Sequence, residues 1–302
     1  RAGPMNTSKS SNQNPTMGIW LMVITMFIFA MQDGLSRHLA GEYNVYMVMM
    51  IRYWFFAGFV IMWSARTSGG LRNVIRSAQP KLQLFRGALL ALEVIVMVIG
   101  FVKLGLVESH AMFAIYPLMI TALSGPLLGE KIGWRRWLSV AVGFVGVLII
   151  LKPSNGVFSP AAVYPLVAAA MFALYGLLNR YVSRKDEASV TFFYTGISGA
   201  IVMTLIGAWF WEPMSPADWG MMALLCASAT IGHYLLIRAY ELAEASAIQP
   251  FAYLQLAFAS ALGVLVFGDV IRLNVAIGTG LVVGAGVFAL VRAQIAASRS
   301  RR

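Results

Sequence analysis

Ten long apolar segments divide this chain, and each has about the length needed to cross a lipid bilayer as a helix. A spanning helix needs about 20 apolar residues. Strands are not expected, because polar and apolar residues do not alternate and a lone strand cannot satisfy its backbone hydrogen bonds in lipid. The segments predicted as helices are residues 17–39, 44–65, 82–102, 109–128, 134–151, 161–182, 189–211, 219–240, 246–267 and 273–291.

The composition favours a membrane protein over a soluble nucleic-acid-binding one. Hydrophobic residues make up 59% of the chain, charged residues 12%, and the mean hydropathy is +0.75. A soluble core of this size could not bury so much apolar surface. The net charge of +11 is concentrated at helix ends, where anionic lipid headgroups also attract it. Cys226 is the only cysteine, which excludes an internal disulfide and a multi-cysteine metal site.

Positive charge alternates between successive loops. Three loops hold several basic residues each: Arg66, Arg72, Arg76 and Lys81; Lys131, Arg135 and Arg136; Arg180, Arg184 and Lys185. The intervening loops hold single ones: Arg37, Lys103, Lys152 and Arg272. Loops rich in Lys and Arg stay in the cytoplasm, so both termini are predicted to be cytoplasmic.

The second half of the chain repeats the first. One proline-bearing helix in each half ends in an apolar–Gly–acidic step, at Glu130 and at Asp269. The repeats are predicted at residues 17–152 and 153–293, after a disordered tail with an expression scar (1–16) and before a basic tail (294–302). Five helices is an odd number, so the second repeat enters the membrane from the opposite side. Inverted repeats of this kind build transporters with a site near the midplane.

The two helix motifs carry a resemblance to a known family. The first runs from Ala114 through Tyr116 and Pro117 to Lys131, and the second from Gln249 to Asp269, with Asp in place of Glu and no basic residue following. Over about residues 17–292 the chain resembles the drug/metabolite transporter superfamily, in its EamA-type exporter branch, and most of all the YddG-type exporters of aromatic and other amino acids. The resemblance implies a ten-helix basket in which the first, third, fourth, sixth, eighth and ninth helices surround a central cavity and the fifth and tenth helices are peripheral.

Glu93 is the clearest candidate functional residue, because it lies in the middle of an apolar helix where an ionisable group is costly. Two interpretations are open. Glu93 carries a proton or binds a substrate amine, or it forms a structural ion pair with Arg52 at a comparable depth in the preceding helix. Arg86, near the inner end of the same helix as Glu93, is expected to extend to the membrane surface.

Pro117 and Pro250 each remove a backbone donor inside an apolar helix, and such breaks are tolerated best beside a cavity or another helix. With the offset of 139 residues between the two motifs, Tyr116 corresponds to Gln255. We expect this pair to face the substrate, although hydrogen bonds between helices are an equally good explanation. The other candidates for the cavity wall are Gln32, Asn179, His233 and Tyr253.

For four polar groups, Asp33, Glu108, His110 and His233, a structural role is the simpler expectation. Asp33 is expected to pair with Arg37, one helical turn further on. Glu108 and His110 are expected to cap the helix that follows them. A lone buried histidine such as His233 is more often a hydrogen-bonded structural group than a proton relay.

The predicted function is secondary transport. We expect a monomer in a bacterial inner membrane that exports amino acids or similar small metabolites by alternating access, without cofactor, metal or nucleic acid. Export and amino acids are implied by the resemblance alone. Protons are a possible coupling ion, with Glu93 as their carrier, and an uncoupled facilitator is the alternative.

Two other functions are less favoured. A sugar-phosphate or nucleotide-sugar antiporter needs cations deep in the cavity to bind phosphate, and Arg52 is the only deep one expected. An intramembrane enzyme needs a nucleophile–base or metal constellation. The three histidines, His38, His110 and His233, lack metal-binding spacing, so an enzyme is not expected.

Overall fold

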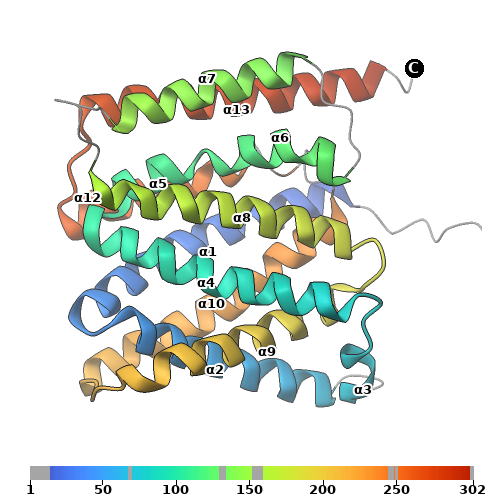
Figure 1. Cartoon of the computed structure of the whole chain (residues 1–302), viewed down its shortest axis with the longest axis vertical. Coiled ribbons are helices and arrows are strands. Elements are labelled where there is room, and N and C mark those ends of the chain that lie inside the picture. Colours follow the sequence, from blue (N-terminus) through green and yellow to red (C-terminus); the bar gives the residue numbers. More distant parts are fainter. Residues whose placement is uncertain are drawn as a thin grey trace, which may run out of the picture.

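The computed structural model describes residues 14–66, 70–128, 134–151, 159–243, 248 and 251–299, and the regular structure in these ranges is entirely helical (Figure 1). The main helices are α1 (Pro15–Glu42), α2 (Val45–Arg66), α3 (Gly70–Ile75), α4 (Pro80–Leu104), α5 (Leu106–Phe113), α6 (Tyr116–Leu128), α7 (Trp134–Leu151), α8 (Val163–Val182), α9 (Ala188–Gly207), α10 (Pro216–Leu242), α12 (Leu254–Phe267) and α13 (Leu273–Arg299). Short 3-10 turns, η2 (Pro160–Ala162) and η3 (Ala208–Phe210), precede α8 and follow α9.

Each of the ten predicted spans contains helix within the described residues, and the structure extends several of them by a few residues. In the described ranges, seven helical segments are long and apolar enough to cross a membrane, α5 and α6 together forming one of them. Three shorter apolar helices, residues 137–151, 254–267 and 273–288, correspond to the remaining spans. The protein is therefore an all-α, multi-pass membrane protein. The short helix α3 was not predicted.

The helices lie side by side between two ends of the molecule. Helices α7 and α13 pack together along one edge, at the top of Figure 1, as the resemblance implied for the fifth and tenth helices. The side that carries α3 and the end of α13 is on the right. We call it the basic end, because Arg66, Arg72, Arg76, Arg180 and Arg184 lie in the segments that meet there. The other side is called the opposite end.

Both repeats interrupt their proline-bearing helix at matching positions. The first interruption is the turn at Ala114 and Ile115 between α5 and α6, and the second is the turn at Tyr253 before α12. Tyr253 follows Ala114 by the same offset of 139 residues. Pro117 therefore lies in the first turn of α6, where its missing N–H leaves no hydrogen bond unmade. Pro250 lies outside the described residues.

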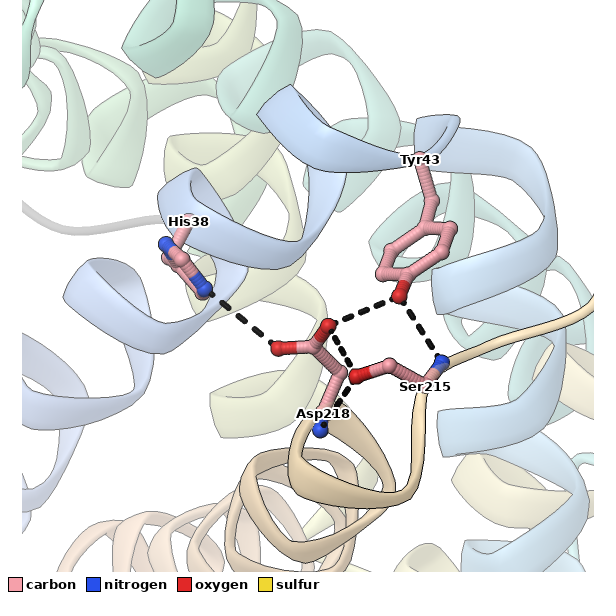
Figure 2. A network of polar contacts seen from close by, with 4 residues as sticks. All are labelled: His38, Tyr43, Ser215 and Asp218. Atoms are coloured by element: carbon pink, nitrogen blue, oxygen red, sulfur yellow. Dashed lines mark hydrogen bonds and ion pairs between the residues drawn. The ribbon is translucent and has the colours of Figure 1, made fainter.

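At the opposite end, the turn between α1 and α2 is fastened to the segment that leads into α10. The Tyr43 hydroxyl donates to the Asp218 carboxylate at 2.7 Å and accepts from the Ser215 backbone N–H at 3.0 Å (Figure 2). His38 Nε2 lies 3.5 Å from the other Asp218 oxygen. Beside this network, the Asn44 amide donates to the Phe210 carbonyl at 2.8 Å. The first repeat is thus tied to the second by polar contacts.

At the basic end, the turn between α8 and α9 makes the reciprocal connection. The buried Asp186 carboxylate accepts from the Ser77 hydroxyl at 2.5 Å, the Ala78 backbone N–H at 2.7 Å and the Gln83 amide at 2.9 Å. These donors lie between α3 and α4 or early in α4. The equivalent turn of each repeat therefore binds the equivalent linker of the other repeat, at opposite ends of the molecule, as an inverted repeat requires.

Arg86 does not extend to the membrane surface, so that prediction was wrong. Its side chain is fully buried between α4, α8 and α9. Its N–H groups donate to Gln83 Oε1 at 3.1 Å, Asn179 Oδ1 at 2.8 Å, the Thr191 carbonyl at 2.7 Å and Thr195 Oγ1 at 2.7 Å. These acceptors make burial of the guanidinium favourable, because a buried charge is tolerated when its hydrogen bonds are satisfied.

Replacing Arg86 by Ala should destabilise the protein strongly. The change leaves the buried acceptors of three helices without donors, which we expect to cost about 3 kcal/mol or more. Thermal unfolding of the purified protein in detergent measures the effect. Arg184→Ala, at an exposed position near the end of α8, is the control and should leave the unfolding midpoint unchanged. Equal midpoints for both variants would contradict the assignment of Arg86 as a structural centre.

Candidate functional site

A small cavity lies between helices of both repeats. Its wall combines aromatic, aliphatic and polar side chains from α1, α2, α4, α5, α8, α10 and α12: Phe29, Gln32, Asp33, Arg52, Glu93, Val94, Met97, Val98, Phe101, His110, Phe113, Phe172, His233 and Gln255. The cavity volume is about 40 Å³, enough for a few water molecules. Ligand pockets usually have volumes of about 300–1,000 Å³, so this cavity is much smaller than a usual ligand pocket.

Asp33 joins three helices at the side of the cavity toward the opposite end. Gln255 of α12 donates to the Asp33 carboxylate at 2.9 Å, and His110 Nε2 of α5 lies 3.1 Å from the same oxygen. The expected pairing of Asp33 with Arg37 was therefore wrong. His110 does not serve as a cap either, because it is buried in the cavity wall and stacks on Phe101 at 5.1 Å. Both expectations failed because they considered one helix at a time, whereas the packing of α5 against α1 brings His110 next to Asp33.

A second polar layer joins α1, α5 and the end of α12, further toward the opposite end. Asp269 accepts from Arg37 Nη1 at 2.9 Å and from the backbone N–H groups of Leu106 and Val107 at 2.8 and 3.3 Å. These amides open α5, where the helix dipole also favours a carboxylate. The Arg37 guanidinium lies 4.3 Å from the centre of the Phe267 ring. Gly105 precedes α5 with φ at 85°, and a Cβ there would lie 2.9 Å from the Asp269 carboxylate.

The two layers cross-link α1, α5 and the end of α12 on the side of the cavity toward the opposite end. Both connect α1 to α5 and α12, so these helices cannot separate there until both layers break. The carboxylate of Asp269 follows the second repeat motif, whereas its first-repeat counterpart Glu130 lies outside the described residues. Glu108 lies in the first turn of α5, as expected for a helix-capping charge, and it also pairs with Arg272 at 3.2 Å.

Arg52 contacts His233 rather than Glu93. The Arg52 Nη2 atom lies 3.1 Å from His233 Nε2, whereas Glu93 and Arg52 form no ion pair within the described ranges. A guanidinium only donates, so His233 Nε2 accepts and the ring proton lies on Nδ1. The ion pair considered between Glu93 and Arg52 is therefore absent from the described residues, and Arg52 binds His233 instead. Glu93 lies in the same cavity wall.

Several buried polar atoms of the wall have no hydrogen-bond partner in the described part of the protein. They are Gln32 Oε1, Arg52 Nε, His110 Nε2 and His233 Nδ1. His110 Nε2 is close to Asp33, but not in hydrogen-bonding geometry. Buried polar groups are nearly always satisfied, so these atoms indicate places for water or for polar groups of a solute.

Four of the predicted wall residues line the cavity and three do not. Gln32, Glu93, His233 and Gln255 belong to the wall. Tyr116 is buried behind it against Phe113 and Phe172, with ring centres 4.9 and 5.0 Å apart. Tyr253 points toward α13, since its hydroxyl occupies the space that a Cβ on Gly286 would need. Asn179 binds Arg86.

Asp33 and His110 were expected to have structural roles, and Arg52 was considered only as a structural partner of Glu93 or as a deep cation, yet all three belong to the wall. Their shared signal was a polar side chain within an apolar span. The aromatic rings of Phe29, Phe101, Phe113 and Phe172 also face the cavity, and apolar residues in apolar helices give no such signal.

The fold places this protein in the class of all-α, multi-pass membrane proteins with a cavity between two repeats. Both halves of the chain match the EamA-like transporter family, at residues 16–152 and 159–291. The chain belongs to this family, and its duplication follows from the two matches. It is a small-molecule transporter of the drug/metabolite transporter superfamily rather than an enzyme.

Curated relatives are similar over most of their lengths. An S-adenosylmethionine uptake transporter of Rickettsia felis is 24% identical over 282 residues, which covers 93% of this chain and 95% of that protein. A riboflavin transporter of Vibrio cholerae is 24% identical, covering 91% and 93%. A pseudopaline exporter of Pseudomonas aeruginosa is 22% identical, covering 94% and 97%. One crystal structure shares the fold, with a TM-score of 0.64, 18% identity and coverage of 95% and 99%.

Asp269→Asn should open the cavity toward the opposite end. Loss of the charge weakens hydrogen bonds worth about 2 kcal/mol, which corresponds to an increase of about 30-fold in the open population. A cysteine at Val98 in the cavity wall, in a Cys226→Ser background, reports this change through its rate of reaction with a charged thiol reagent in detergent. Glu42→Gln, at an exposed position near the same end, is the matched control. An unchanged rate in Asp269→Asn would show that this layer does not hold the cavity closed.

Proposed function

We propose that the protein transports a small amphoteric metabolite with an aromatic part, an amino acid or an amino-acid conjugate, through this cavity by alternating access. The observation that carries the proposal is the composition of the wall. Arg52 can bind a carboxylate, Asp33 and Glu93 can bind an amine, and phenylalanine rings line the same cavity. A solute with both charges and a ring matches all three kinds of group.

The names of the relatives support this class of solute in part. S-adenosylmethionine carries an amino-acid group and a heteroaromatic ring, and riboflavin carries a heteroaromatic ring without an amine. Relatives are named for uptake and for export, so they do not decide between the directions. We propose export across a bacterial inner membrane by a monomer with cytoplasmic termini, which places the basic end inside according to the distribution of Lys and Arg.

Alternating access requires the cavity to expand and to open at one end at a time. The small volume of the cavity and the two polar layers toward the opposite end support a state that is closed there. Release on that side would need α5 and α12 to part from α1. The turns within the α5–α6 span and before α12 offer places where these helices can bend.

Uptake into proteoliposomes tests the substrate class. Purified protein should transport radiolabelled L-phenylalanine, L-tryptophan or S-adenosylmethionine faster than protein-free vesicles, and Arg52→Gln should lower the rate about tenfold or more by removing a charge-assisted hydrogen bond. Arg76→Gln, at an exposed position, should leave it unchanged. Transport of riboflavin alone, or of none of these solutes by folded protein, would overturn the proposed class.

Glu93 is the proposed proton carrier, and a pH gradient tests this role. If Glu93 exchanges its proton between the two sides, an imposed gradient should accelerate wild-type uptake, and Glu93→Gln should abolish the acceleration while solute binding persists. Glu42→Gln is the control, because it removes an exposed carboxylate. Wild-type uptake that ignores the gradient would identify a facilitator and leave Glu93 as a binding group only.

A further inference from the structure

A larger cavity opens at the basic end, between α2, α3, α9 and α10. We call it the vestibule. Its volume is about 580 Å³, which is in the range of ligand pockets, in contrast to the smaller central cavity. Trp63, Phe192 and Tyr234 form an aromatic side of the vestibule, with the Phe192 and Tyr234 rings 5.2 Å apart and the Trp63 and Tyr234 rings 5.8 Å apart.

Charged groups of both signs surround this aromatic side. Arg66 at the end of α2 and Glu187 before α9 line the vestibule with exposed side chains. Arg238 and Glu241 line it from the last turns of α10 and pair with each other. Both of these side chains remain partly exposed, so a solute can exchange for one member of the pair at a modest cost.

Contacts between aromatic rings link the wall of the vestibule to the wall of the central cavity. Phe192 lies in the vestibule wall, and its ring centre is 4.9 Å from that of Phe56. Phe56 in turn stacks on His233 at 6.2 Å, and His233 belongs to the central wall. The contacts therefore run from the vestibule through Phe192 and Phe56 to His233 and Arg52.

We propose that the vestibule is a second binding site for the transported solute, which takes the same class of amphoteric, aromatic molecule before it passes Phe56 and Phe192. This inference rests on the proposed function for the class of solute. The ring of the solute stacks on Tyr234 and Trp63, its carboxylate binds Arg238 or Arg66, and its amine binds Glu241 or Glu187. The vestibule, at about 580 Å³, is large enough for such a molecule, whereas the central cavity, at about 40 Å³, is too small.

Protection of a single cysteine tests the vestibule, with L-tryptophan as the probe. In a Cys226→Ser background, Asn73→Cys places a thiol in the vestibule wall, whereas Arg72→Cys places one beside it on the same helix, outside the wall. L-tryptophan at about ten times its Kd should slow modification of Asn73→Cys by N-ethylmaleimide about tenfold. Modification of Arg72→Cys should not change.

Two further variants show whether the protection arises in the vestibule itself. Adding Arg52→Gln, which weakens the central site, should leave the protection in place. Adding Arg238→Gln together with Tyr234→Ala should remove it. The inference is overturned if Asn73→Cys is never protected, or if Arg52→Gln abolishes the protection.

Transport assays separate this inference from the proposed function. Uptake of L-tryptophan without protection of Asn73→Cys would overturn the second site and leave the proposed function standing. Protection without uptake of any amphoteric solute would support the vestibule site and refute the proposed function.

Discussion

The helices on one side of the cavity are cross-linked by two carboxylates, each held by more than one helix. In lipid, a buried charge has no water to satisfy it, so its partners must come from neighbouring helices. Asp33 and Asp269 each receive groups from α1, α5 or α12, and together they connect all three helices. Because the two carboxylates share these helices, neither layer can open without straining the other. The same requirement explains why Arg86 is buried with four acceptors.

The sequence predicted the spans well, because the length and apolar character of a membrane helix are imposed by the bilayer. The duplication was also predictable, from the repeated helix ends at Glu130 and Asp269. The partners of individual charges were not. Arg37 was assigned to Asp33 because the two are one turn apart, but the structure pairs Arg37 with Asp269, 232 residues further on. Such choices depend on the packing of helices, which helical spacing does not determine.

The burial of Arg86 bears on the less favoured antiporter function. With Arg86 and Arg52 both deep in the protein, the premise that Arg52 is the only deep cation was wrong. Yet the donors of Arg86 are engaged by protein acceptors, and Arg86 is not part of the cavity wall. In the cavity wall, Arg52 is accompanied by the carboxylates of Asp33 and Glu93. One guanidinium beside two carboxylates is a poor match for a multiply charged phosphate. The wall therefore still fits an amphoteric solute better.

The turns that each repeat contributes to the other make the two repeats depend on each other for stability. Tyr43 and Asn44 of the first repeat hold the segment before α10, and Asp186 of the second holds the segment before α4. Helix α1 packs along α10, and α2 along α9, so each repeat covers the other. Neither repeat encloses a core by itself. The two sequence repeats are therefore not independently stable units. A single repeat on its own would leave its polar turns and its inner surface without partners.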